Sequence, residues 1–114
     1  MDEVLNNLYE SSLEHRRIHQ CGAVPFQHGK FLTDFVASTK AERILEIGTG
    51  VGYSTICLAL GNEEANIETI DKDPIHVALA KENCEKLGLK NITFHESKAE
   101  EILPKLSEKF DLIF

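Results

Sequence analysis

Three glycines, Gly48, Gly50 and Gly52, stand at alternate positions directly after a short apolar run that contains Glu46. Glycine lacks a Cβ and adopts positive φ at little cost, so a ligand can lie directly against such a backbone. A strand that enters a helix through a glycine loop also directs backbone N–H groups and the positive end of the helix toward one point. The segment 44–55 therefore predicts a binding site for a polar ligand.

The spacing of these glycines separates two classes of ligand. A dinucleotide-binding loop follows G-x-G-x-x-G/A, and its third small residue would fall where this chain has Tyr53. The chain instead reads G-x-G-x-G, with Glu46 two residues before the first glycine. A carboxylate there can accept hydrogen bonds from an ammonium group, which a pyrophosphate lacks. The spacing argues against a nicotinamide-dependent oxidoreductase.

The elements that position this loop alternate between helix and strand. Periodicity and breakers predict helices over 2–19, 27–39, 53–60, 74–87 and 98–106, and strands over 43–47, 66–70, 91–95 and 110–114. The segment 43–47 is a short apolar run without strict alternation, as expected of a parallel strand that is covered on both faces. Asp73 followed by Pro74 supplies an N-cap and a first helical residue. The alternation implies an α/β domain with a mostly parallel sheet.

Composition limits the functions that this chain can have. Its 114 residues, of which 42% are hydrophobic and 27% charged, suit one globular domain at most. The net charge of −7 gives no general attraction to phosphate backbones or anionic lipids, so a nucleic-acid substrate would need a local basic patch. Neither a signal peptide nor an apolar run of membrane-spanning length is present, so we expect a cytoplasmic protein without a membrane partner.

Cysteine and histidine give no clear metal site. Cys21, Cys57 and Cys84 are an odd number without metal-type spacing, and we expect reduced thiols in or near the core. His15 and His19 lie one helical turn apart, but no third ligand accompanies them. The other three histidines, His28, His76 and His95, have no triad partner apparent in the sequence. We therefore expect surface or packing roles for them.

Four segments in order resemble class I S-adenosylmethionine-dependent methyltransferases, and among them the small O-methyltransferases related to the catechol and caffeoyl-CoA enzymes. These segments are PFQHGKFL (25–32), LEIGTGVGYS (45–54), IETIDKDP (67–74) and FDLIF (110–114). The resemblance implies a Rossmann-like, doubly wound parallel sheet of strand order 3-2-1-4, with extra N-terminal helices. Residues 1–24 would form a helix and connector, and residues 25–114 the cofactor-binding domain.

The resemblance also implies roles for individual residues toward S-adenosylmethionine. Glu46 and Gly48 correspond to residues around the methionine moiety, and the adjoining Thr49 and Gly50 are also expected to bind the cofactor. Ser54 corresponds to a residue that binds the amino-acid end of the cofactor, and the backbone of Val24 would lie near the same end. Glu46 and Ser54 have simpler alternatives, because they could cap the loop amides and the following helix.

Asp71 corresponds to the acidic residue that takes both ribose hydroxyls, although Asp-Lys-Asp-Pro is also good turn chemistry. Lys98 and Ala99 correspond to the pair that borders the adenine. The family more often has an acidic residue where this chain has Lys98, so that contact would depend on the backbone amide. Glu100 and Glu101 are expected in the first turn of a helix, where negative charge is favourable.

The family's metal-binding acidic residues and catalytic base follow the fourth strand, so we expect them, and any divalent metal, only beyond Phe114. The sequence thus predicts the cofactor-binding half of an O-methyltransferase, truncated after its fourth strand and inactive alone. The alternative is a non-catalytic S-adenosylmethionine-binding or interaction module. Small phenols, acyl-CoA esters and a modified RNA base all remain open as methyl acceptors. The apolar edge formed by 110–114 predicts self-association.

Overall fold

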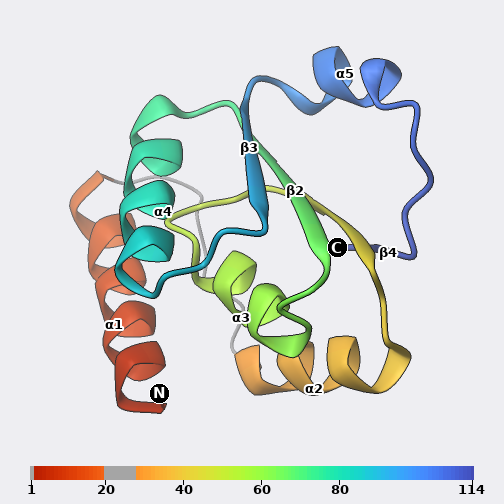
Figure 1. Ribbon diagram of the computed structural model, residues 1–114. Coiled ribbons are helices and arrows are strands. Elements are labelled where there is room, and N and C mark those ends of the chain that lie inside the picture. Colours follow the sequence, from red (N-terminus) through yellow and green to blue (C-terminus); the bar gives the residue numbers. More distant parts are fainter. Residues whose placement is uncertain (1, 20–27) are drawn as a thin grey trace.

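The computed structural model describes residues 2–19 and 28–114 (Figure 1). Along the chain its elements are α1 (Asp2–His19), α2 (Gly29–Thr39), β1 (Arg43–Ile47), α3 (Tyr53–Gly61), β2 (Asn66–Asp71), α4 (Pro74–Lys86), β3 (Ile92–Glu96), α5 (Ala99–Ile102), the short 3-10 helix η1 (Leu103–Lys105) and β4 (Leu112–Ile113). Helix and strand alternate after α2, as the sequence predicts.

The four strands form one parallel sheet in the order β3-β2-β1-β4, which confirms the expected order 3-2-1-4. Ile44 in β1 lies opposite Ile67 in β2 and opposite Leu112 in β4. Because the strands are parallel, their carboxyl ends, and the loops that follow them, meet at one edge of the sheet. In Figure 1 the helices α2 and α3 lie together below the sheet, while α5 lies at the opposite side of the picture.

The main core lies between the sheet and the helices α2 and α3. It includes Leu32 and Val36 from α2, Leu58 from α3, and Ile44 and Ile67 from the sheet, all 4% exposed or less. A Cβ at Gly61 would approach Val36 and the carbonyl of Thr33 to within 3 Å, so only glycine lets α2 and α3 pack this closely. Cys57 and Cys84 are free and buried, as predicted, while Cys21 lies outside the described residues.

Helix α1 packs beside α3 and α4. Leu8 is buried against Ile56 of α3 and Cys84 of α4. Two other apolar residues of α1, Val4 and Leu13, are 43% and 36% exposed. The buried side of α1 is therefore only partly apolar, since it also contains Ser12, whose hydroxyl donates to the carbonyl of Leu8 at 2.8 Å.

The last two predicted elements are shorter than expected. The helix predicted over 98–106 is one α-helical turn, α5, and then tightens into η1, which contains Pro104 and so lacks one N–H donor. Strand β4 spans only Leu112–Ile113, although ladder hydrogen bonds join Phe114 to Leu45 and Ile47. The carboxylate of Asp111 accepts from the amides of Glu42 and Arg43, at 2.9 and 3.0 Å, and so fixes the start of β4 beside β1.

Within the described residues, none of the helices has both the length and the apolar character that crossing a membrane requires.

Candidate cofactor-binding site

The glycine loop between β1 and α3 uses positive φ at all three glycines. The φ angles of Gly48, Gly50 and Gly52 are 94°, 57° and 96°, which other residues adopt only at a cost. A Cβ at Gly52 would lie 3.1 Å from Ala80, so this glycine lets α3 and α4 approach each other. Among the residues that the structure describes, no atom lies within 4 Å of a Cβ placed at Gly48 or Gly50. The first two glycines therefore leave open space beside the backbone, and the third serves helix packing.

Glu46 is buried beneath this loop, with 1% of its surface exposed. Its Oε1 accepts hydrogen bonds from the hydroxyls of Thr55 at 2.5 Å and Thr69 at 2.7 Å, and its Oε2 accepts from the hydroxyl of Ser54 at 2.6 Å. Burial raises the pKa of the Glu46 carboxyl, against the effect of these three hydrogen bonds. Glu46 thereby joins β1 to β2 and to the first turn of α3.

Thr49 is also turned inward, since it is 3% exposed and its hydroxyl lies 2.7 Å from that of Thr69. The predicted residues Glu46, Thr49 and Ser54 therefore form one connected group of polar side chains beneath the loop. The two oxygens of Glu46 already accept from three protein hydroxyls. The hypothesis that Glu46 also accepts from an ammonium group stays a prediction.

Asp71 connects the end of β2 to the glycine loop. Its Oδ2 accepts from the amide of Gly50 at 2.9 Å, and its Oδ1 accepts from the amide of Asp73 at 2.9 Å. The side chain of Asp73 in turn accepts from the amide of Ile75 at 2.9 Å and caps α4, as the sequence predicts. The carboxylate of Asp71 thus has a fixed place between two loops at the carboxyl edge of the sheet.

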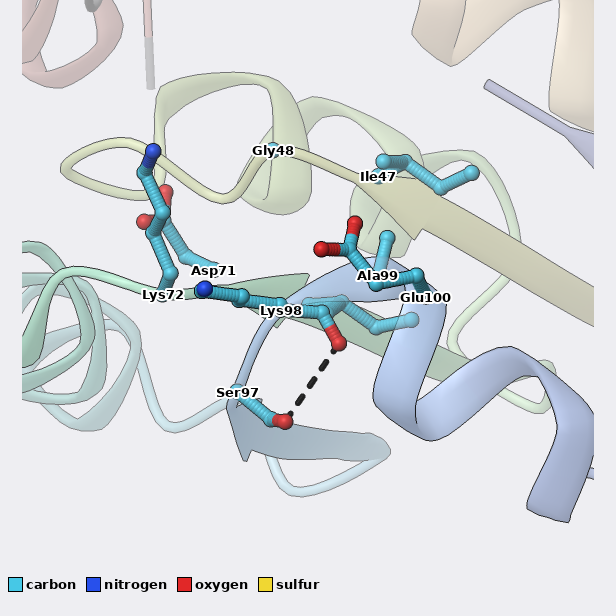
Figure 2. A pocket seen from close by; sticks show the side chains of 9 residues that line it. Ile47, Gly48, Asp71, Lys72, Ser97, Lys98, Ala99 and Glu100 are labelled. Atoms are coloured by element: carbon cyan, nitrogen blue, oxygen red, sulfur yellow. Dashed lines mark hydrogen bonds between the residues drawn. The ribbon is translucent and has the colours of Figure 1, made fainter.

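A cleft of about 390 Å³ opens beside Asp71 at this edge (Figure 2). It is lined by residues from the ends of β1, β2 and β3 and the segments that follow them, namely Ile47, Gly48, Ile70, Asp71, Lys72, Ser97, Lys98, Ala99 and Glu100. Four predicted site residues, Gly48, Asp71, Lys98 and Ala99, therefore lie on one cleft. Val24 lies outside the described residues.

Five lining residues were not among the predicted site residues: Ile47, Ile70, Lys72, Ser97 and Glu100. Figure 2 shows the Glu100 carboxylate directed into the cleft from the first turn of α5. Ile47 is 47% exposed although it ends a core strand, so it gives the cleft an apolar surface. These five residues could have been found from their positions at or just after the ends of strands, because open α/β sheets bind ligands outside the carboxyl ends of their strands.

The parallel sheet, the glycine loop and the acid that ends the second strand define a Rossmann-like domain with a cleft at the carboxyl edge of its sheet. Residues 38–114 match the family model described as "Methyltransferase domain". The catechol O-methyltransferase of Niastella koreensis is 39% identical over an alignment of length 92, which covers 75% of this chain and 42% of that protein.

Solved structures give the same result over the whole chain. The O-methyltransferase TomG of Streptomyces achromogenes, described as in complex with S-adenosylmethionine, is 30% identical to this chain, with a TM-score of 0.83. The match includes 100% of this chain and 53% of TomG. The methyltransferase PaMTH1 of Podospora anserina, described as bound to S-adenosylhomocysteine, is 27% identical to this chain, with a TM-score of 0.85. The match includes 100% of this chain and 50% of PaMTH1.

The chain therefore belongs to the S-adenosylmethionine-dependent methyltransferases, in the family of catechol- and caffeoyl-CoA-type O-methyltransferases. It spans about half the length of the relatives that it matches. The family and the fold that the sequence predicts are confirmed. The contacts of individual residues with a cofactor stay predictions.

Proposed function

We propose that this chain is the cofactor-binding part of an O-methyltransferase that transfers a methyl group from S-adenosylmethionine to an oxygen nucleophile. The observation that supports this proposal is the shared cleft at the carboxyl edge of the sheet. The glycine loop, Asp71 and the 97–100 segment border it together. Its volume of about 390 Å³ lies in the range of pockets that hold small organic ligands.

The proposed roles follow the geometry of the cleft. The ribose would hydrogen-bond to Asp71, whose carboxylate is held beside the loop. The adenine would lie against the apolar side chain of Ile47 and the backbone of Lys98 and Ala99. Glu100 adds an acceptor that could receive an N–H of the base, and so supplies the acidic group that position 98 lacks in this chain. Open space beside Gly48 and Gly50 would let the cofactor approach the loop.

The remaining predicted residues would act from beneath the loop. The hydroxyl of Ser54 is hydrogen-bonded to Glu46, and the hydroxyl of Thr49 to that of Thr69, which itself donates to Glu46. This arrangement fixes the first turn of α3, whose N–H groups are directed at the amino-acid end of the cofactor. The backbone of Val24 is proposed for the same end, on the resemblance alone.

Bound S-adenosylmethionine supplies an electrophilic methyl group on a sulfonium sulfur. The contribution of this chain is to hold the nucleoside and the amino-acid end so that the methyl group has one direction, since positioning is the main catalytic contribution to such a transfer. We propose a small molecule of the phenol type as the acceptor, because the relatives include catechol O-methyltransferases. The net charge of −7 disfavours RNA. A divalent metal and a catalytic base are proposed only for the longer protein.

A non-catalytic cofactor-binding module is the second candidate. It is favoured by one observation, which is that the chain spans about half the length of the relatives it matches. Such a module would bind S-adenosylmethionine with the same residues but would lack the groups that activate the acceptor. The two candidates therefore predict the same cofactor affinity and differ in turnover.

The experiment measures cofactor binding by this chain, and turnover by the longer protein beside this chain. Calorimetric titration with S-adenosylhomocysteine measures cofactor binding, and transfer of a labelled methyl group to catechol in the presence of Mg²⁺ measures turnover. Binding with transfer by the longer protein supports the enzyme, and binding without transfer by either protein supports the module. An absence of binding would contradict both candidates. Asp71→Ala serves as the control that should lose most of the binding heat.

A further inference from the structure

His76 is a buried histidine in the first turn of α4, where the sequence predicted only a surface or packing role. The residue is 7% exposed. Its Nδ1 lies 3.3 Å from Oδ2 of Asp71, while its Nε2 is buried and has no hydrogen-bond partner among the described residues. Oδ2 of Asp73 lies 3.6 Å from Nε2, which is beyond hydrogen-bond distance. The ring thus has one directed contact, and it is with the acid at the end of β2.

A second helix holds the ring in this place. The ring of His15, in α1, packs edge-on against the ring of His76, with 5.1 Å between centroids and 63° between planes. The groups that face His76 are therefore Asp71 from β2, Asp73 from the turn before α4, and His15 from α1. Because the ring is packed from α1 and directed at Asp71, its position is set by tertiary structure.

The contact between His76 and Asp71 fills one of the acceptor directions of the Asp71 carboxylate. Oδ2 accepts from the Gly50 amide and lies near His76 Nδ1, and Oδ1 accepts from the Asp73 amide. A carboxylate offers about four acceptor directions, so these three contacts leave one, on Oδ1. The free direction of the carboxylate is therefore defined by the three donors together.

We propose that His76 is a positioning residue for ribose recognition, which donates its Nδ1–H to Asp71 and keeps Oδ1 directed at a ribose hydroxyl. This proposal rests on the proposed cofactor-binding function. Since the Asp71 carboxylate only accepts, the proton must be on Nδ1. The other ring nitrogen, Nε2, has no hydrogen-bond partner among the described residues, so the contact with Asp71 is the one hydrogen bond that can orient the ring.

Two variants separate hydrogen bonding from packing. His76→Phe keeps an aromatic ring against His15 but removes the donor, and His76→Asn keeps an N–H donor close to the place of Nδ1. Calorimetry would measure the dissociation constant of S-adenosylhomocysteine and that of its 2′,3′-dideoxy analogue, which lacks both ribose hydroxyls. We expect His76→Phe to weaken S-adenosylhomocysteine about tenfold, to leave the analogue unchanged, and His76→Asn to restore most of the loss.

A purely structural role would give a different result. Equal affinity of parent and His76→Phe for S-adenosylhomocysteine, or an equal loss for both ligands, would overturn the positioning role while the cofactor-binding function stands. A parent chain that binds no S-adenosylhomocysteine would overturn the proposed function and this inference with it.

A second readout does not depend on ligand binding. Nitrogen-15 NMR of the His76 ring in the parent chain should show a proton on Nδ1. A ring whose proton is on Nε2 alone would overturn the proposal, even if His76→Phe fails to fold.

Discussion

The amide of Gly50 donates a hydrogen bond of 2.9 Å to Oδ2 of Asp71, so the loop after β1 is joined directly to the end of β2. The two residues are 21 positions apart in the sequence. They meet because β1 and β2 are neighbours in a parallel sheet, whose carboxyl ends lie at one edge. Two motifs that the sequence presents separately therefore form one side of a single cleft.

Asp71→Ala should weaken S-adenosylhomocysteine binding by a factor of about 10 to 100. The variant removes the hydrogen-bond acceptor proposed for the ribose, and a hydrogen bond to a charged group contributes about 1.5 to 3 kcal/mol. It also frees the Gly50 amide, so part of the loss would come from the loop. Calorimetric titration of parent and variant measures the change.

Glu96→Ala is the matched control for Asp71→Ala. Glu96 is paired with Asp71 in the register of β2 and β3, and it ends its strand in the same way, but it does not line the cleft. Removing it deletes the same charge nearby. A similar loss of affinity in both variants would mean that net charge, and not the ribose contact, explains the effect.

Gly48→Val should abolish the increase in melting temperature that S-adenosylhomocysteine produces. The side chain would enter the open space beside the loop, and the φ of 94° would be strained for any residue with a Cβ. Gly88→Val is the control, because Gly88 also has a positive φ of 70° and open space around it, but lies away from the cleft.

Both glycine variants should melt at lower temperature than the parent in the absence of ligand, by a comparable amount. Only Gly88→Val should keep the ligand-induced increase. If Gly48→Val kept an increase equal to that of the parent, no ligand would lie against this loop.

The sequence predicted the sheet and the glycine loop because each depends on local signals. Apolar runs bounded by Gly, Asp and Pro gave β1 and β2, and their order followed from the resemblance. The inward direction of Glu46 could not be predicted in this way. Its three hydroxyl partners come from two different elements, and two of them, Thr55 and Thr69, have no distinctive spacing from it.

The contact between His76 and Asp71 could not be predicted for a similar reason. The ring of His76 packs against that of His15, which lies far away in the sequence, so no local pattern indicates where the ring lies. A histidine five residues after an acid has no strong local signal. The length of β4 was overpredicted, since it spans only Leu112–Ile113. At its start the side chain of Asp111 accepts from the amides of Glu42 and Arg43, which an apolar pattern does not indicate.

Glu46→Gln should become more stable relative to the parent as pH rises. Burial raises the pKa of Glu46 above its ordinary value of 4.5, so the folded chain keeps this proton at pH values where the unfolded chain has lost it. The stability that this group contributes is therefore full below the unfolded value and falls as pH rises through the folded value. The difference amounts to about 1.4 kcal/mol for each unit by which the pKa is raised.

Thermal or urea unfolding of parent and Glu46→Gln between about pH 4 and pH 8 measures this difference, and the other carboxylates cancel in the comparison. A parent that gains stability over the variant with rising pH would contradict the assignment. It would mean that the hydroxyls of Ser54, Thr55 and Thr69 stabilise the charged carboxylate more than burial destabilises it.

The 114-residue chain should self-associate through the edge formed by 110–114. Ile113 and Phe114 are 62% and 40% exposed at an apolar strand edge, which can pair with another chain. Ile113→Lys should reduce association in light scattering over a dilution series. Leu112→Lys is a less specific probe, because Leu112 packs against the core and its replacement would also destabilise the fold.

Ile18→Lys controls for the added charge, since Ile18 is 60% exposed on α1 and remote from β4 in the sequence. Only Ile113→Lys should shift the chain toward monomer. A parent chain that stays monomeric at high concentration would show that this edge does not pair.

The most direct test of the cofactor-binding site is an amide NMR titration of the chain with S-adenosylhomocysteine. The proposed site predicts the largest shift changes at Gly48, Gly50, Asp71 and Ala99, because their backbone groups border the cleft or bond to its acid. A second cleft, lined by residues 87–91 and by Glu63, Glu64 and Asn66, provides an internal comparison and should change little. If the titration reaches saturation with shift changes only at the second cleft, or produces no shift changes at all, it would contradict the proposal that this chain binds the cofactor at its glycine loop.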